Sequence, residues 1–67
     1  MNKIIVSYYH GKKYSDLKFN LDEEFDYSTR KLNSIVHYLI KRGYSVQIRP
    51  YQYYILIWID KGRFSQK

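Results

Sequence analysis

The sequence predicts an α+β fold in which a four-stranded mixed sheet carries one helix on one face, with the elements in the order ββαββ. Residues 51–60 alternate large apolar side chains with mixed ones, which is the period of a strand with one buried face. Residues 32–40 place apolar side chains three and four positions apart, which is the period of a helix stripe. Residues 3–9, 14–21 and 44–49 are short and either β-branched or alternating, as strands are.

The chain is short, basic and aromatic. Its 67 residues predict one compact domain over residues 1–61, followed by a short polar tail at 62–67. With no Cys there is no disulfide and no thiolate metal site, and with no signal peptide or membrane span we expect a soluble, cytoplasmic protein. Twelve Lys and Arg against six Asp and Glu make the formal net charge +6, which favours polyanionic partners and solubility alike. Aromatic residues make up 19%, more than so small a core can bury, so several should be exposed, where Tyr and Trp favour binding.

The first two strands are expected to form a hairpin. Residues 3–9 are β-branched and aromatic and too short for a helix. A polar break containing Gly11 supplies the turn, and residues 14–21 resume with apolar and polar side chains in alternation. The side chains expected to face the core from the first strand are Ile4, Val6 and Tyr8.

The helix is expected to follow the acidic run 22–26. Asp22 and Asp26 can each cap a helix start, and acids suit the positive end of the helix dipole. An apolar stripe then continues to Ile40, and Lys41, Arg42 and a following Gly end the helix. The residues of the stripe are Leu32, Ile35, Val36, Leu39 and Ile40.

The last two strands are expected at residues 44–49 and 52–61, joined by a tight turn at Pro50. In the earlier strand, Tyr44, Val46 and Ile48 should face the core. In the later one, the odd positions should face the core and the even positions should face away from the helix. Those odd positions, counted from the turn, are Tyr51, Tyr53, Ile55, Ile57 and Ile59.

The element order predicts the strand order 2-1-4-3. The first and fourth strands, the most apolar, pair in parallel at the centre, and the more polar strands take the edges. This arrangement resembles the β-grasp architecture, both the ββαββ order of the immunoglobulin-binding domains of streptococcal protein G and the first half of ubiquitin. The resemblance covers residues 3–61, and architecture of this kind does not carry function. Residues 63–67 differ from the Gly-Gly ending of ubiquitin, so conjugation is not implied.

The predicted topology gathers cations at one end of the sheet, here called the basic pole, with His10 nearby. Acids 22–26 should lie at the opposite end. The basic pole has two interpretations: a phosphate-binding patch, or a solvated surface whose cations complement the helix C-terminus. Its residues are Lys12, Lys13, Lys41, Arg42, Lys61 and Arg63.

The second candidate surface is an aromatic face on the side of the sheet away from the helix. Three interpretations stay open. Single-stranded nucleic acid could stack on the rings, another protein or a second copy could cover them, or long neighbours such as Lys18 and Arg49 could lie over them. The residues assigned to this face are Tyr54, Leu56, Trp58, Tyr9, Ile5, Lys18 and Arg49.

The sequence contains no pattern that indicates catalysis. The carboxylates sit in one run expected to cap the helix, and His10 and His37 are far apart, so neither an acid–base pair nor a metal site is expected. No Gly-rich phosphate loop is present, and no cofactor is expected.

Taken together, these features predict a small, basic, non-catalytic binding module. The basic pole and the aromatic face jointly favour nucleic acid, DNA or RNA, as the partner. The alternative is a protein-interaction module or a homodimer, for instance a small phage- or virus-type inhibitor of a host protein. An apolar face centred on Leu56 and Trp58 suits protein contact better than it suits a base.

Overall fold

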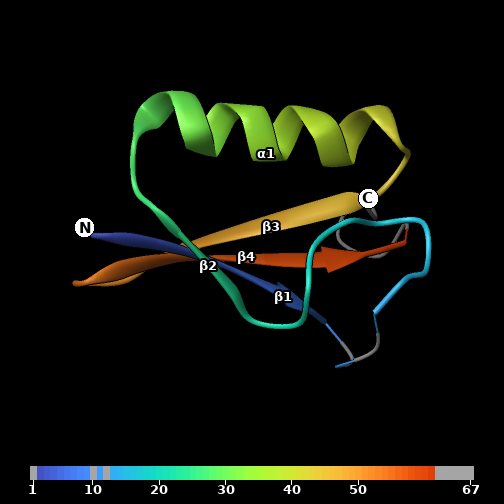
Figure 1. The fold of residues 1–67 in the computed structure, drawn as a ribbon, viewed down its shortest axis with the longest axis horizontal. Coiled ribbons are helices and arrows are strands. Elements are labelled where there is room, and N and C mark those ends of the chain that lie inside the picture. The colour runs from blue at the N-terminus through green and yellow to red at the C-terminus, as the bar shows by residue number, and fades with distance from the viewer. Residues whose placement is uncertain (1, 10, 12, 62–67) are drawn as a thin grey trace.

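The structure, a computed structural model, describes residues 2–9, 11 and 13–61. Its sheet has the strand order β2-β1-β4-β3, and α1 lies across one face (Figure 1). The α+β class and the strand order are therefore as predicted, whereas the expected tail at 62–67 lies outside the described residues. The elements are β1 (Lys3–Tyr8), β2 (Glu23–Asp26), α1 (Thr29–Lys41), β3 (Ser45–Pro50) and β4 (Tyr54–Asp60).

The two central strands are the most apolar ones. β1 and β4 run parallel and in register from Lys3 opposite Tyr54 to Tyr8 opposite Ile59. β2 and β3 each pair antiparallel with one of them and form the two edges of the sheet. An edge strand presents unpaired backbone groups to solvent, so the short or polar strands suit the edges and the continuous apolar runs lie in the middle.

The second strand is not where the alternation predicted it. The pairing partner of β1 is Glu23–Asp26, and residues 14–21 form part of a long connection instead. Leu17 and Phe19, which would have lined one face of the predicted strand, are only 3% exposed, so the connection places them in the core without strand pairing. The alternation of residues 14–21 therefore predicted burial correctly for Leu17 and Phe19, but it was wrong for Leu21, which is 49% exposed, and wrong about strand structure.

The acidic run does not cap the helix. Ser28 is the N-cap of α1, because its backbone is extended and its Oγ accepts a hydrogen bond from Lys31 N at 3.0 Å. Glu23 pairs with Val6, part-way along β1, so the acids line the β2 edge and do not form a pole opposite the cations. A short, charged edge strand resists pairing with other chains, which is a use of these acids that the sequence reading missed.

The core lies between α1 and the sheet. Ile35 and Leu39 of the helix face the buried positions of β1 and β4, and Tyr44 closes the end of this layer. Three strand side chains predicted to face the core are exposed instead: Ile48 at 44%, Tyr51 at 43% and Tyr53 at 65%. Ile40, the last residue of the predicted helix stripe, is also exposed, at 58%. Ile48 lies on the edge strand β3, and the two tyrosines lie in the turn before β4 begins.

Candidate functional site

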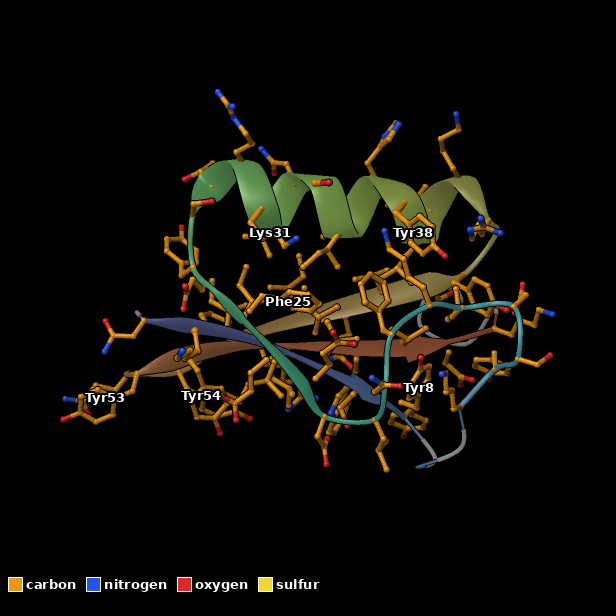
Figure 2. All side chains as sticks on the ribbon, viewed as in Figure 1. Tyr8, Phe25, Lys31, Tyr38, Tyr53 and Tyr54 are labelled. Carbon is orange, nitrogen blue, oxygen red and sulfur yellow. The ribbon has the colours of Figure 1, made fainter. Side chains whose placement is uncertain are left out.

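The side of the sheet away from α1, here called the open face, carries Tyr54, Leu56 and Trp58 of β4. Figure 2 shows Tyr54 on this side, while Lys31, Phe25 and Tyr38 lie between the helix and the sheet. Because β1 and β4 are parallel and in register, Ile5 lies beside Leu56. The apolar centre of the open face consists of Ile5, Tyr54, Leu56 and Trp58, all partly buried.

Strand register orders the open face into rows that run across the sheet. One row reads Glu24, Ile5, Leu56, Arg49 from the β2 edge to the β3 edge. It therefore has an acid at one end, two apolar side chains in the middle and a cation at the other end. The next row places Trp58 between a small residue, Ser7, and the polar Gln47.

Aromatic contacts fix the rings at the two ends of this face. Tyr9 meets Trp58 edge-on, with ring centroids 5.3 Å apart and an interplanar angle of 68°. The guanidinium carbon of Arg49 lies 5.0 Å from the centre of the Trp58 ring, a cation–π distance. Tyr51 stacks on Tyr54 at 5.0 Å. Arg49 thus covers part of Trp58, as one of the three interpretations of this face proposed.

Lys18 does not belong to the open face. Its Nζ lies 4.7 Å from the ring centre of Tyr38 and 5.7 Å from that of Phe19, on the side of the sheet that α1 covers. The misplacement follows from the misplaced strand: residue 18 belongs to the connection over the core, and alternation along a strand does not apply to it. The other six residues assigned to the aromatic face lie together on the open face.

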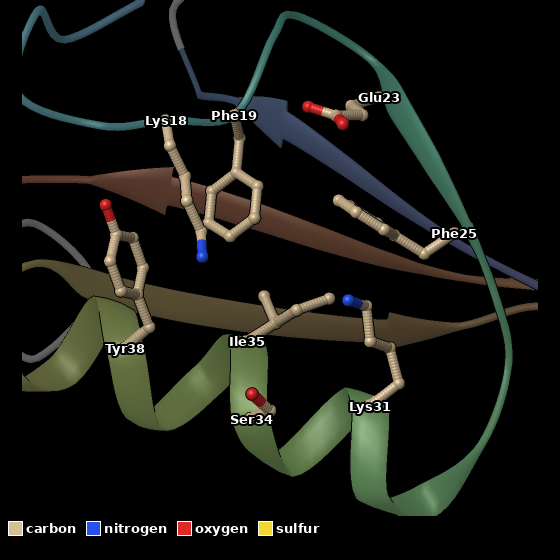
Figure 3. Close-up of a pocket in the computed structure, with 8 residues that line it drawn as sticks. All are labelled: Lys18, Phe19, Glu23, Phe25, Lys31, Ser34, Ile35 and Tyr38. Carbon is tan, nitrogen blue, oxygen red and sulfur yellow. The ribbon is translucent and has the colours of Figure 1, made fainter.

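Lys18 instead lines a groove between α1 and β2, with a volume of about 250 Å³. Figure 3 shows the amines of Lys18 and Lys31 reaching into this groove from its two ends. Lys31 Nζ lies 4.8 Å from the Phe25 ring centre, and Glu23 Oε1 accepts a hydrogen bond from the backbone N of Asn20 at 2.8 Å. The lining residues are Lys18, Phe19, Glu23, Phe25, Lys31, Ser34, Ile35 and Tyr38.

The groove was not found from the sequence, because it depends on where β2 lies. One signal was available: Lys31, Ser34, Ile35 and Tyr38 recur at helical spacing and so share one side of α1. The other wall could not be inferred without the strand pairing of Glu23 and Phe25.

Two residues of the predicted basic pole lie over aromatic rings at one end of the sheet. Lys61 Nζ is 5.4 Å from the Tyr44 ring centre and 5.8 Å from that of Tyr14, and the guanidinium carbon of Arg42 is 4.6 Å from the Tyr38 ring centre. Lys13 and Lys41 are exposed. The remaining predicted members of the pole, Lys12 and Arg63, and the neighbouring His10 lie outside the described residues.

This end of the molecule also holds two carboxylates that the sequence reading did not place there. The Tyr14 hydroxyl donates a hydrogen bond to Asp60 Oδ1 at 2.7 Å, and the Tyr44 hydroxyl donates one to Asp16 Oδ1. The hydrogen bond from Tyr44 lowers the pKa of Asp16, and the nearby charges of Lys61 and Arg42 lower it further. Burial, together with the negative Asp16, raises the pKa of Tyr44 to about 12. The described part of the pole is therefore a mixed cluster of cations, acids and tyrosines.

The described part of the chain offers no group of three His, Cys, Asp or Glu side chains that could hold a metal ion. Among those residues there is also no helix with the length and apolar character needed to span a membrane. Comparison of the chain with protein-family models, with curated proteins and with solved structures finds no match to any of them.

Proposed function

We propose that this chain is a non-catalytic module that binds another protein through the open face. The observation that carries the proposal is the apolar centre formed by Ile5, Tyr54, Leu56 and Trp58, which lies on the face that α1 does not cover. Protein interfaces combine an aromatic and apolar centre with a polar rim, and an exposed apolar patch commonly marks such a site. Here the rim carries Glu24 on one side and Arg49 on the other.

The charges around the open face favour a protein over a nucleic acid. Phosphate contacts supply most of the affinity for nucleic acids. The β2 flank of the face presents Glu24 and Asp26, which would repel phosphates, and Lys3 is engaged with Asp26 in an ion pair of 3.1 Å. Lys61 and Arg42 of the basic pole lie close enough to Asp16 for their charges to lower its pKa, so an acid accompanies the cations there.

Nucleic acid is the second candidate, and a specific contact supports it. Trp58, with Tyr9 at its edge and Arg49 over its ring, has the form of a platform on which a base could stack. The net charge of +6 would add long-range attraction to a polyanion.

A peptide selection tests the first candidate. Peptides from a displayed random library are selected on the wild-type protein and then measured against Trp58→Ala, Leu56→Lys and, as a control on the outer side of the helix, Arg30→Ala. We expect the two open-face changes to weaken binding at least about tenfold, the loss of one buried anchor, and the control to leave it unchanged. Circular dichroism checks that each variant is folded.

A salt titration separates the two candidates. Short single-stranded DNA and RNA are titrated at low and at physiological salt by fluorescence anisotropy. Binding that falls steeply with salt and again with Trp58→Ala would replace the protein proposal with the nucleic-acid one. If the selected peptides bind Trp58→Ala and Leu56→Lys as tightly as the wild type, the open face is not the binding site.

A further inference from the structure

We infer that the partner of the open face is a second copy of this chain, packed sheet against sheet in a symmetric dimer. The inference rests on the proposed function and names the partner of the same surface. The inference is supported by the row Glu24, Ile5, Leu56, Arg49. When a second copy of this row is turned end for end and placed over the first, each acid meets a cation and each apolar side chain meets an apolar one. A two-fold symmetric interface requires such self-complementarity, because the same patch must serve both copies.

The orientation of the dimer follows from this row. A two-fold axis parallel to the strands and passing between β1 and β4 exchanges the two edges of the sheet. It sets Glu24 opposite the partner's Arg49 and Ile5 opposite the partner's Leu56. Both ends of the row then carry an ion pair across the interface, and the middle is apolar. Sheets packed in this way keep their strands nearly aligned.

The neighbouring rows fit the same operation. Trp58 comes to lie over the partner's Ser7, so the largest side chain of the face meets one of the smallest. In the row of Tyr54, the partner's Lys3 comes to lie opposite Tyr54, while its ammonium stays paired with Asp26 of its own chain. The size match of Trp58 and Ser7 therefore agrees with the axis that the first row selects.

A two-fold axis that lies between the two sheets but runs perpendicular to the strands is disfavoured by charge. A two-fold axis perpendicular to the strands keeps each edge over itself, so it stacks Glu24 on the partner's Glu24 and Arg49 on the partner's Arg49. Like charges placed opposite one another cost free energy, so the strand-parallel axis is preferred.

The area predicts that the dimer is weak. Three strand spacings of about 4.8 Å and four residues of β4 at about 3.3 Å enclose a patch of roughly 14 by 13 Å between Cα positions. Even with the reach of its side chains, this is smaller than the ~800 Å² that each partner buries in a standard interface. The net charge of +6 on each copy adds repulsion that physiological salt screens beyond about 8 Å. We therefore expect association that depends on concentration.

Charge exchange tests the inference. Sedimentation equilibrium at physiological salt measures the dissociation constant of the wild type, of Glu24→Arg, of Arg49→Glu and of the double variant. Each single change creates two like-charge contacts and should weaken the dimer about tenfold, whereas the double variant, with the charges exchanged, should recover most of that loss. Arg30→Glu, on the helix, changes the net charge as Arg49→Glu does and should have little effect.

Mixing the two single variants is the decisive measurement. In a mixed pair every charge on Glu24→Arg faces an opposite charge on Arg49→Glu, so the mixture should dimerise about tenfold more tightly than either variant alone. The chain has one Trp, and quenching of Trp58 fluorescence by acrylamide should fall as the wild type dimerises. A mixture that stays monomeric while the wild type dimerises would overturn this geometry.

The oligomeric state of the wild type and the binding of selected peptides test the dimer and the proposed function separately. A wild type that remains monomeric at all accessible concentrations overturns the dimer, while selected peptides that need Trp58 and Leu56 would still support a different protein partner. A dimer that is unaffected by every substitution on the open face would place the contact elsewhere and overturn the inferred dimer, whereas only selected peptides that bind independently of Trp58 and Leu56 would overturn the proposed function.

Discussion

Tyr8 and Phe19 are joined by a buried hydrogen bond in which the Tyr8 hydroxyl donates to the Phe19 carbonyl oxygen at 2.6 Å. The contact ties the end of β1 to the connection that leads to β2. Both side chains are at most 3% exposed, and burial raises the pKa of Tyr8. This bond therefore satisfies a backbone carbonyl that would otherwise be left unpaired in a stretch without strand pairing.

Removing this hydroxyl should destabilise the fold. Tyr8→Phe keeps the ring but leaves the Phe19 carbonyl without its donor, which costs about 1–3 kcal/mol for a buried group. Urea unfolding followed by circular dichroism measures the change. Tyr53→Phe, at a position 65% exposed, is the matched control and should be neutral. Equal effects of the two substitutions would contradict the role assigned to Tyr8.

Stability should depend on pH through Tyr44. Its pKa is raised to about 12 in the folded chain, whereas an unfolded tyrosine titrates near about 10. A raised folded pKa contributes stability that is fully present below the unfolded value and is lost as pH rises through the folded one. We expect the free energy of unfolding of wild type minus that of Tyr44→Phe to fall between about pH 10 and 12. A difference that stays constant over this window would disagree with the buried, hydrogen-bonded hydroxyl.

The carboxyl of Asp16 should titrate below the usual range of aspartate. The hydrogen bond from Tyr44 and the charges of Lys61 and Arg42 lower its pKa, so its stabilising contribution is present above the usual aspartate pKa and is lost as pH falls through the folded value. Carbon-13 NMR titration of the side chain measures this directly. In Tyr44→Phe the Asp16 pKa should move upward, and an unchanged pKa would show that the hydrogen bond is not its main cause.

The N-cap of α1 should be sensitive to substitution. Ser28→Ala removes the Oγ that accepts from Lys31 N, which costs about 0.5–2 kcal/mol of stability. Ser34→Ala, an exposed position inside the same helix, should be neutral or slightly stabilising because Ala has the higher helix propensity. Thermal unfolding of both variants checks the prediction, and a cap substitution without effect would indicate that another group satisfies Lys31 N.

Shortening one core side chain should have a measurable cost. Ile57 is fully buried at the centre of β4, and Ile57→Val should lower the free energy of unfolding by about 0.5–1.5 kcal/mol. Ile40, 58% exposed on the helix, supplies the same chemical change at the surface, where Ile40→Val should stay within about 0.5 kcal/mol. Guanidinium unfolding distinguishes the two, and a silent Ile57→Val would argue that the centre of the sheet is loosely packed.

Several features of this protein were determined by local sequence. The period of residues 32–40 placed the helix, and the apolar runs of residues 3–9 and 51–60 identified the two central strands. The strand order also followed from the sequence. The helix must cover one face of the sheet, and polar strands belong at its edges, so few strand orders remain possible. The alternation along β4 assigned Tyr54, Leu56 and Trp58 to the face away from the helix.

The tertiary structure decided the second strand, and with it the charge pattern of the surface. Leu17 and Phe19 have the spacing of a strand, but spacing records only which side chains are buried, and a connection anchored by Tyr8 can bury them equally well. Glu23 to Asp26 has little intrinsic strand preference and pairs because β1 offers an open edge and Phe25 fits the core. Only this long-range pairing places Glu24 in the same row as Arg49. The row on which the proposed dimer rests therefore could not be predicted from the sequence.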